Sequence, residues 1–109
     1  MPIEILDLIS SPKPNKRFRI KIQEGDKVKT FDFGLDDGAT YIDHEDIPKR
    51  EAYWARHCGN KKETQLINNL IPSASLFAAR LLWGSSTSLF DNLIELQSSF
   101  NKKAAEKSN

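Results

Sequence analysis

Residues 16–23, Lys-Arg-Phe-Arg-Ile-Lys-Ile-Gln, alternate apolar and cationic side chains without a break. A period of two predicts a β-strand that buries its apolar face and turns its cations the other way. The buried residues of this strand are expected to be Phe18, Ile20 and Ile22. The following stretch, residues 24–27, contains Gly25 and is typical of a tight turn. The sequence therefore predicts a β-hairpin.

The return strand over residues 27–34 changes phase part-way along. Val28 takes the inward position at its start, whereas Phe31 and Phe33 take it further on. A β-bulge near Thr30 would accommodate this slip, because a bulge adds one unpaired residue to a strand. We therefore expect the second strand of the hairpin to be irregular.

Apolar segments with helical spacing follow the hairpin. Asp43 or Asp46 is a candidate cap for a helix that begins near Pro48, since proline is tolerated in the first turn. Gly59 is a suitable end for that helix. The predicted helical segments span residues 48–58, 66–71, 76–83 and 89–100. The order of elements predicts an α+β fold in which an N-terminal β-hairpin or small antiparallel sheet packs against about three C-terminal helices.

Length and composition limit the domain organisation. A chain of 109 residues is long enough for one domain, and a single cysteine excludes an internal disulfide framework. We expect an N-terminal arm and linker over residues 1–15, one α+β domain over 16–100 and a polar, frayed tail over 101–109. No run approaches the roughly 18 apolar residues of a membrane span, so no membrane span is predicted.

Residues 40–60 hold both histidines and the only cysteine, and so raise the question of a chemical site. A structural zinc site needs about four ligands. His57 and Cys58 are adjacent, and adjacent helical side chains diverge by about 100°. No ligand set closes, so no metal, no cofactor and no catalytic residue is predicted. A small metal-dependent nuclease remains the second alternative, built from His44 or His57, from Asp43, Glu45 or Asp46, and from Arg50 or Arg56.

A structural interpretation of the same stretch is preferred. Acidic residues near a helix N-terminus satisfy its free N–H groups and its dipole, and Tyr53/His57 and Trp54/Cys58 each share a helix face. Cys58 is expected to be a buried thiol behind Trp54. Four residues of the helix, Tyr53, Trp54, Arg56 and His57, are expected to lock the hairpin to the helices. The full set given a structural role is Asp43, His44, Asp46, Tyr53, Trp54, Arg56, His57 and Trp83.

Cations gather on the hairpin and on the helix after it, although the net charge is only +1. Such a surface contacts either a polyanion or an acidic protein surface. The weak net charge argues against a dedicated nucleic-acid binder. The residues predicted to bind a partner are Arg17, Arg19, Lys21, Lys27, Lys29, Lys49 and Arg50.

An ordered series of short motifs resembles a family of small uncharacterised proteins encoded by large DNA viruses and some phages. The resemblance covers residues 28–96, most of the predicted domain. In that family a strand ending in Phe-Gly precedes a Tyr-x-x-His-x-Asp segment, an Arg-x-x-Tyr-x-x-Arg-His helix and a Leu-Leu-Trp segment. The matching segments are Phe31–Gly34, Tyr41–Asp46, Lys49–His57 and Leu81–Gly84.

The resemblance implies a viral origin and supplies no catalytic residue. The leading hypothesis is a minor structural protein of a virion, a non-enzymatic cement or adaptor that binds larger capsid proteins through the basic hairpin and exposed apolar residues. Its expected location is the virion, and the cytoplasm or nucleoplasm of the infected cell during assembly. The first alternative is a nucleic-acid-binding protein that packages or coats the genome.

Overall fold

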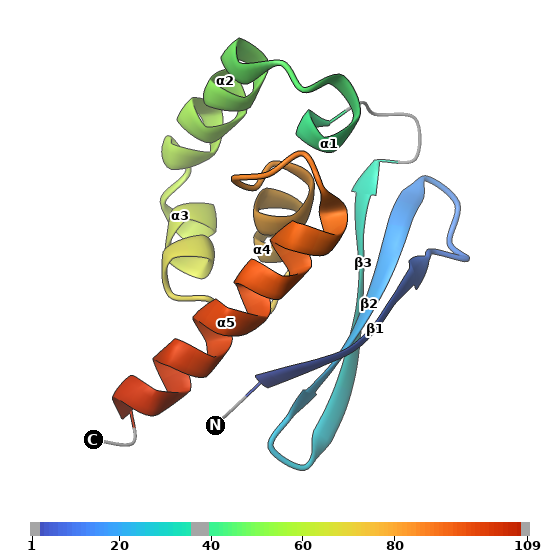
Figure 1. Cartoon of the computed structure of the whole chain (residues 1–109), viewed down its shortest axis with the longest axis vertical. Coiled ribbons are helices and arrows are strands. Elements are labelled where there is room, and N and C mark those ends of the chain that lie inside the picture. Colours follow the sequence, from blue (N-terminus) through green and yellow to red (C-terminus); the bar gives the residue numbers. More distant parts are fainter. Residues whose placement is uncertain (1–2, 36–39, 108–109) are drawn as a thin grey trace.

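The structure is a computed structural model that describes residues 3–35 and 40–107 (Figure 1). The side chain of Cys58 lies outside this description, and so does the expectation that its thiol is buried. A three-stranded sheet is formed by the N-terminal third of the chain, and the helices that follow cover one of its faces (Figure 1). The predicted α+β class is confirmed.

Strands β2 (Lys16–Glu24) and β3 (Lys27–Leu35) form the predicted hairpin, with Gly25 at a φ of 64° in the turn. Ile20 lies opposite Phe31 across the two strands. Directly opposed residues of an antiparallel pair share a face of the sheet, so this pair points towards the helices together. The alternation in β2 therefore predicted the buried face correctly.

The bulge predicted near Thr30 is wrong, because the pairing of β2 with β3 runs without a shift past this residue. Val28 lies opposite Gln23 on the outer face and is 55% exposed. Lys29 takes the inward register position instead. It lies near the open end of the sheet, where its Nζ reaches Glu24 Oε1 at 3.0 Å and stays in solvent.

The third strand, β1 (Ile3–Ser10), pairs antiparallel with β2 and completes the order β1-β2-β3. The segment expected to be an arm is thus part of the sheet. A shift in register between Ile5 and Asp7 breaks the alternation of β1, which hid the strand from a period-two pattern. The outer edge of β1 is closed by Gln97: its Oε1 accepts from Ile5 N–H at 2.7 Å, and its Nε2 donates to Ile3 O at 2.8 Å.

The helical half begins with a short helix that the sequence did not predict, and its last helix continues through most of the expected frayed tail. The segment predicted over 76–83 starts as α-helix and continues as π-helix. The elements are α1 (Tyr41–His44), α2 (Ile47–Cys58), α3 (Lys61–Asn68), α4 (Ala74–Phe77), the π-helix η1 (Ala78–Leu82) and α5 (Leu89–Lys107). No helix of the described residues is long and apolar enough to cross a bilayer.

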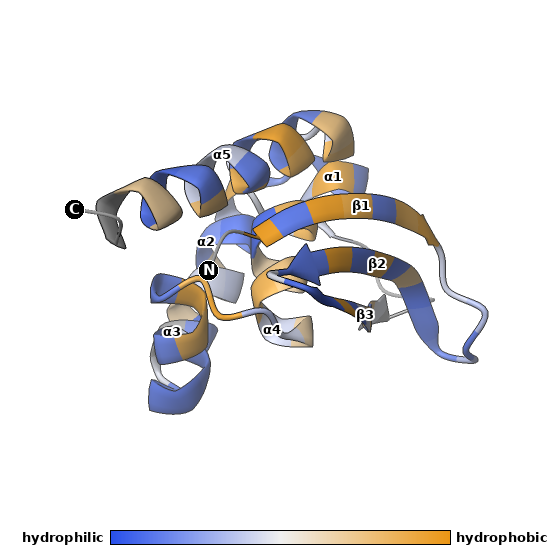
Figure 2. Ribbon diagram, turned by 90° about the horizontal axis from the view of Figure 1, so that it is seen from below, coloured by the Kyte–Doolittle hydropathy of each residue, from blue (hydrophilic) through white to orange (hydrophobic). Residues whose placement is uncertain are grey.

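The core lies between the sheet and the helices, with α5 beside β1 and α4 beside β3 (Figures 1 and 2). Each layer contributes side chains with almost no exposed surface, which are Ile20, Ile22, Phe33, Leu76, Phe77, Leu81, Leu82, Leu96 and Phe100. Burial of apolar surface on this scale is the main force that holds the two layers together.

Asn92 is a buried polar residue on α5 that fixes the chain after η1. Its Nδ2 donates to Leu81 O at 3.0 Å and to Ser86 O at 2.8 Å, and its Oδ1 accepts from Ser86 N–H at 3.0 Å. Gly84 leaves the space for this amide, because a Cβ at Gly84 would lie 2.7 Å from Asn92 Oδ1. The segment between η1 and α5 is therefore held by a specific polar network.

Candidate functional site

Helix α2 carries most of the polar residues of interest, and its start is set as predicted. Asp46 Oδ1 accepts from Lys49 N–H at 3.2 Å, and Pro48 lies in the first turn. Asp43 has another role, since it closes a capping box with Thr40 in α1. Of the two predicted cap candidates, Asp46 is therefore the cap of α2, whereas Asp43 lies in the first turn of α1 and bonds back to its N-cap, Thr40.

Four aromatic rings contact one another in a row that we call the ring ladder, made of His44, Trp83, Tyr53 and His57. The ring centroids of His44 and Trp83 are 5.3 Å apart, those of Trp83 and Tyr53 are 4.5 Å apart, and those of Tyr53 and His57 are 4.1 Å apart. The Tyr53 and Trp83 planes lie 6° from parallel. The ladder joins α1, α2 and the residue that follows η1, so these three parts of the chain are held together by one set of aromatic contacts.

Two hydrogen bonds attach α2 to the same segment after η1. Arg50 Nε donates to Gly84 O at 2.7 Å, and Trp54 Nε1 donates to Trp83 O at 2.9 Å. The Arg50 guanidinium also lies 5.4 Å from the Tyr41 ring centroid. The prediction that Tyr53 and Trp54 lock the hairpin to the helices is thus corrected, because both hold α2 to the segment before α5. Arg50, which was predicted to bind a partner, is engaged within the chain.

His57 is oriented by a residue that the sequence analysis did not single out. Glu63 Oε2 lies 2.5 Å from His57 Nδ1, so an ionised Glu63 places the proton of a neutral His57 on Nδ1 and leaves Nε2 as an acceptor. Helix α3 brings Glu63 there because Asn60 Oδ1 accepts from Glu63 N–H at 3.2 Å. The Asn60-x-x-Glu63 spacing, which is typical of a helix start, was the signal available for this contact.

His44 has one ring nitrogen paired and one unpaired. Asp46 N–H donates to His44 Nδ1 at 2.9 Å, which assigns the proton of the neutral ring to Nε2. That Nε2 is buried and has no partner among the described residues. No group of three or more His, Cys, Asp or Glu residues within the described part of the chain is placed to hold a metal ion. The two histidines therefore share the ring ladder but have separate hydrogen-bond partners, Asp46 N–H for His44 and Glu63 for His57.

Arg17 and Asp43 form a bidentate ion pair between β2 and α1. Arg17 Nη1 donates to Asp43 Oδ2 at 2.6 Å, and Nη2 donates to Oδ1 at 2.7 Å. These bonds hold the pKa of Asp43 well below its usual range, although desolvation opposes the shift, and they raise the pKa of Arg17. Arg17 is thus committed to a contact inside the chain and is a poor candidate for a partner surface.

The other predicted partner-binding cations fall into two groups. Arg19 pairs with Asp32 at 3.0 Å on the outer face of the sheet, where Lys13 also reaches Asp32 at 3.5 Å, and Lys29 pairs with Glu24. Ion-pair partners among the described residues are absent for Lys21, Lys27 and Lys49. The hairpin surface is therefore a network of neutralised charges with a few free lysines.

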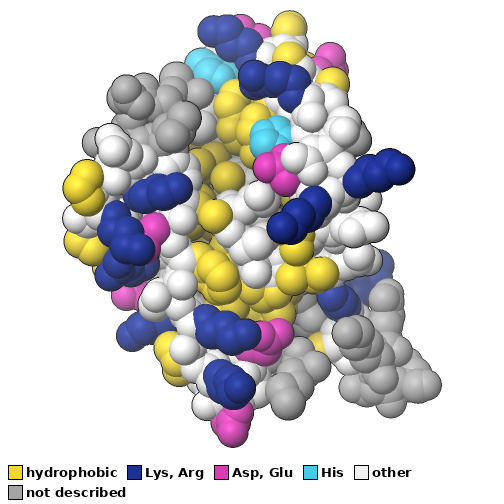
Figure 3. All heavy atoms as spheres, turned by 180° about the vertical axis from the view of Figure 1, so that it is seen from behind, with side chains coloured by type: hydrophobic (Ala, Val, Ile, Leu, Met, Phe, Trp, Pro, Cys, Tyr) yellow, Lys and Arg dark blue, Asp and Glu magenta, His cyan; other side chains and the backbone are white. Residues whose placement is uncertain are grey.

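A cleft of about 710 Å³ opens on the back of the molecule, between β3 and helices α2 to α4 (Figure 3). We call it the back cleft. Phe33 and Leu82 form part of its apolar lining, and cations from both sides stand at its rim (Figure 3). Tyr53 reaches into it from α2, 8% exposed, and burial raises the pKa of its hydroxyl to about 12. The hydroxyl therefore stays protonated and can donate a hydrogen bond.

An exposed apolar surface lies on the opposite side, where α5 crosses β1. Phe90 is 68% exposed and Ile94, one helical turn later, is 53% exposed. Leu6 of β1 is also exposed, and a groove of about 510 Å³ runs between these elements. We call this surface the front patch. Large apolar side chains that gather on one surface are typical of a contact with a partner.

Comparison with known proteins gives one partial match. Residues 6–57 are similar to a family of unknown function (DUF5754). The matched span runs from β1 to the end of α2, so it contains Arg17, Asp43, Tyr53 and His57, whereas Glu63 and Trp83 lie beyond it. No curated protein and no solved structure gives a significant match. The likeness adds no activity, so the function is argued from the surfaces.

Proposed function

We propose that this chain is a virus-encoded minor structural protein of a virion, a non-enzymatic cement or adaptor that binds larger capsid proteins. The viral origin follows the motif resemblance in residues 28–96. The binding role rests on the front patch, whose Phe90 and Ile94 face solvent side by side on α5. Aromatic and aliphatic anchors surrounded by polar residues are the usual centre of a protein interface.

The surroundings of the front patch indicate what kind of partner fits. Asp7 on β1 and Asp91 on α5 are exposed beside the apolar side chains. An acidic rim favours a partner whose apolar anchor is flanked by lysine or arginine, because complementary charge steers association. The groove between Leu6 and Phe90 offers such an anchor a place to insert.

The front patch replaces the basic hairpin as the main contact in this proposal. Arg17, Arg19 and Lys29 are paired with acids of the same chain, so binding through them would first require those ion pairs to open. A cation that turned to a partner would leave the acid of its own chain without its ion-pair partner, which costs free energy. The same pairing weakens the case for a genome-coating protein, which needs free cations along a phosphate backbone.

Mass spectrometry of purified virus particles tests the virion assignment, and the absence of the chain from particles would overturn it. Incorporation of Phe90→Glu/Ile94→Glu then tests the surface. We expect this variant to fold and to be lost from particles. The matched control is Ile47→Glu/Ile71→Glu, since both residues are exposed and lie away from the front patch. Equal incorporation of both variants would show that the chain is a virion protein held by another surface.

A further inference from the structure

We infer that the back cleft binds a small amphipathic anion, an aliphatic or aromatic body that carries one carboxylate or phosphate. The body would lie against Ala78 and Trp83, which line the cleft and are partly exposed, and the anionic group would lie at the rim between Lys16 and Arg56. This inference is independent of the front patch, which lies on the other side of the molecule.

The size and lining of the back cleft favour a small molecule. A volume of about 710 Å³ lies within the range of ligand sites, which bury an apolar body and place a few polar groups around it. Phe33 and Leu82 are packed beneath the cleft with almost no exposed surface, and the partly exposed Ala78 and Trp83 present apolar surface to it. A ligand with an apolar body would displace water from the exposed apolar surface of Ala78 and Trp83, which is favourable.

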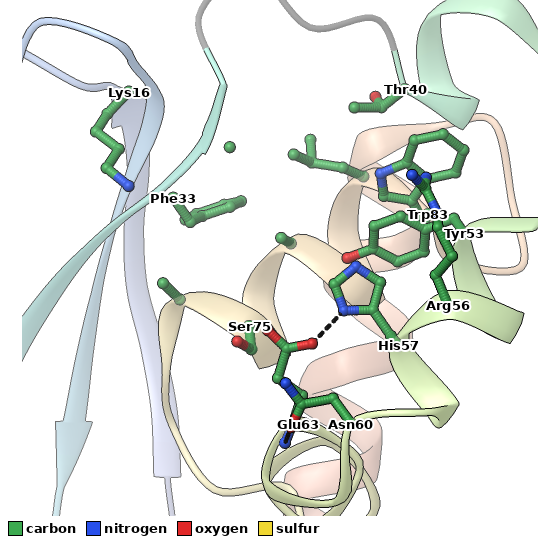
Figure 4. A pocket seen from close by; sticks show the side chains of 14 residues that line it. Lys16, Phe33, Thr40, Tyr53, Arg56, His57, Asn60, Glu63, Ser75 and Trp83 are labelled. Atoms are coloured by element: carbon green, nitrogen blue, oxygen red, sulfur yellow. Dashed lines mark hydrogen bonds and ion pairs between the residues drawn. The ribbon is translucent and has the colours of Figure 1, made fainter.

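The charged groups at the rim indicate the sign of the ligand. Lys16 approaches from the sheet and Arg56 from α2, on opposite sides of the cleft (Figure 4). Both are exposed, and neither has an ion-pair partner among the described residues. The acid in the lining, Glu63, is bonded to His57. Two unpaired cations against one hydrogen-bonded carboxylate favour an anion.

The ring ladder supplies donors and holds the helix side of the cleft in place. The Tyr53 hydroxyl points into the cleft (Figure 4) and is available to an anionic oxygen, because no described residue accepts from it. Its ring is fixed between Trp83 and His57 at centroid distances of 4.5 and 4.1 Å. A donor on a fixed ring loses little side-chain entropy when it binds, so the site is preorganised.

The test uses three probes with the whole chain, all below their micelle concentrations: decanoate, decyltrimethylammonium and butyrate. Decanoate is expected to bind at one saturable site and to shift the Trp83 indole resonance in a ¹H–¹⁵N spectrum, since Trp83 lines the cleft. Decyltrimethylammonium has the wrong charge and butyrate too small a body, so both should bind at least about tenfold more weakly. Two results would overturn the inference. One is equal binding of decanoate and decyltrimethylammonium, and the other is a dissociation constant for decanoate weaker than about 1 mM.

A pair of charge variants locates the site. Lys16→Met/Arg56→Met should weaken decanoate binding by about tenfold, since two charge contacts of moderate strength are removed. Lys61→Met/Lys62→Met removes the same charge from exposed positions of α3 outside the lining and should leave the affinity within about twofold. A loss of the same size in both variants would mean that net charge, and not the cleft, attracts the probe. Thermal melting of each variant separates a binding defect from a folding defect.

Discussion

Tyr53 and Trp83 lie face to face, 30 positions apart in the chain, with ring centroids 4.5 Å apart and planes 6° from parallel. Their contact joins α2 to the segment between η1 and α5. Because α2 stands across the back cleft from β3, this stack helps to set the position of the helix side of the cleft, together with the Arg50 and Trp54 hydrogen bonds. The ladder is therefore the support of the candidate site.

Replacement of Trp83 by leucine should destabilise the protein strongly. The substitution removes the stack with Tyr53 and the ring contact with His44. We expect a loss of about 3 kcal/mol in the free energy of unfolding, as for other half-buried or buried large aromatic residues. Urea denaturation measures it, with exposed Phe90→Leu as a control expected to change stability by less than about 0.5 kcal/mol. Similar values for the two variants would contradict the supporting role of the ladder.

The ionisation of Tyr53 should be visible at high pH. Burial raises its pKa to about 12, whereas an unfolded tyrosine has a pKa of about 10. Only the unfolded state loses this proton between those values, so the stability that Tyr53 contributes is present below pH ~10 and is lost as pH rises towards ~12. Absorbance at 295 nm should show a late phenolate transition that Tyr53→Phe removes. A Tyr53→Phe variant with the same late transition would refute the assignment.

Acid should weaken the protein through Asp43. Its pKa is held below the usual range by the Arg17 hydrogen bonds, while an unfolded aspartate has a pKa of about 3.9. The stabilisation is therefore present above pH ~4 and is lost as pH falls through the lower folded value. The melting temperature of Asp43→Asn should therefore change less than that of the parent protein between pH 5 and pH 2.

The same ion pair can be tested at pH 7 from its other side. We expect Arg17→Met to lower the free energy of unfolding by about 1 kcal/mol, and Lys21→Met, which breaks no ion pair, to lower it much less.

The polar network of Asn92 should tolerate little change. Asn92→Ala leaves Leu81 O and the Ser86 backbone groups without a partner in a buried place, which we expect to cost about 3 kcal/mol. Gly84→Ala should be comparably damaging, because the new Cβ would overlap Arg80 O and Asn92. Asn68→Ala on the exposed side of α3 is the control. Thermal unfolding within 2 °C of the parent for Asn92→Ala would rule out this role.

The strands of the sheet could be predicted where apolar and polar residues alternate regularly, and they could not where this alternation is broken. Phe18, Ile20 and Ile22 follow a strict period of two, and the structure buries this face of β2. The register shift between Ile5 and Asp7 breaks the same signal in β1. Val28 was predicted to be inward because it is apolar, but it is exposed. Hydrophobicity alone does not show whether helices cover a residue near the open end of a sheet.

The site was only partly predictable because its members come from distant segments. Tyr53 and His57 lie four residues apart, so their shared face follows from helix geometry. The stacking of Tyr53 on Trp83 depends on the path of the chain through α3, α4 and η1, which no local pattern fixes. The place of Glu63 in the first turn of a helix could have been predicted from the Asn60-x-x-Glu63 spacing. Its contact with His57 depends on the turn between α2 and α3, which that spacing does not determine.

The two hydrogen bonds between Gln97 and strand β1 have a consequence for synthesis on the ribosome. Ile5 and Gln97 are 92 positions apart, so the first strand of the sheet emerges long before the side chain that closes its edge. Until α5 leaves the exit tunnel, β1 presents open backbone groups, which are prone to pair with strands of other chains. A nascent chain arrested before Gln97 is thus expected to be more accessible to proteases and chaperones at β1 than one arrested after α5 has emerged.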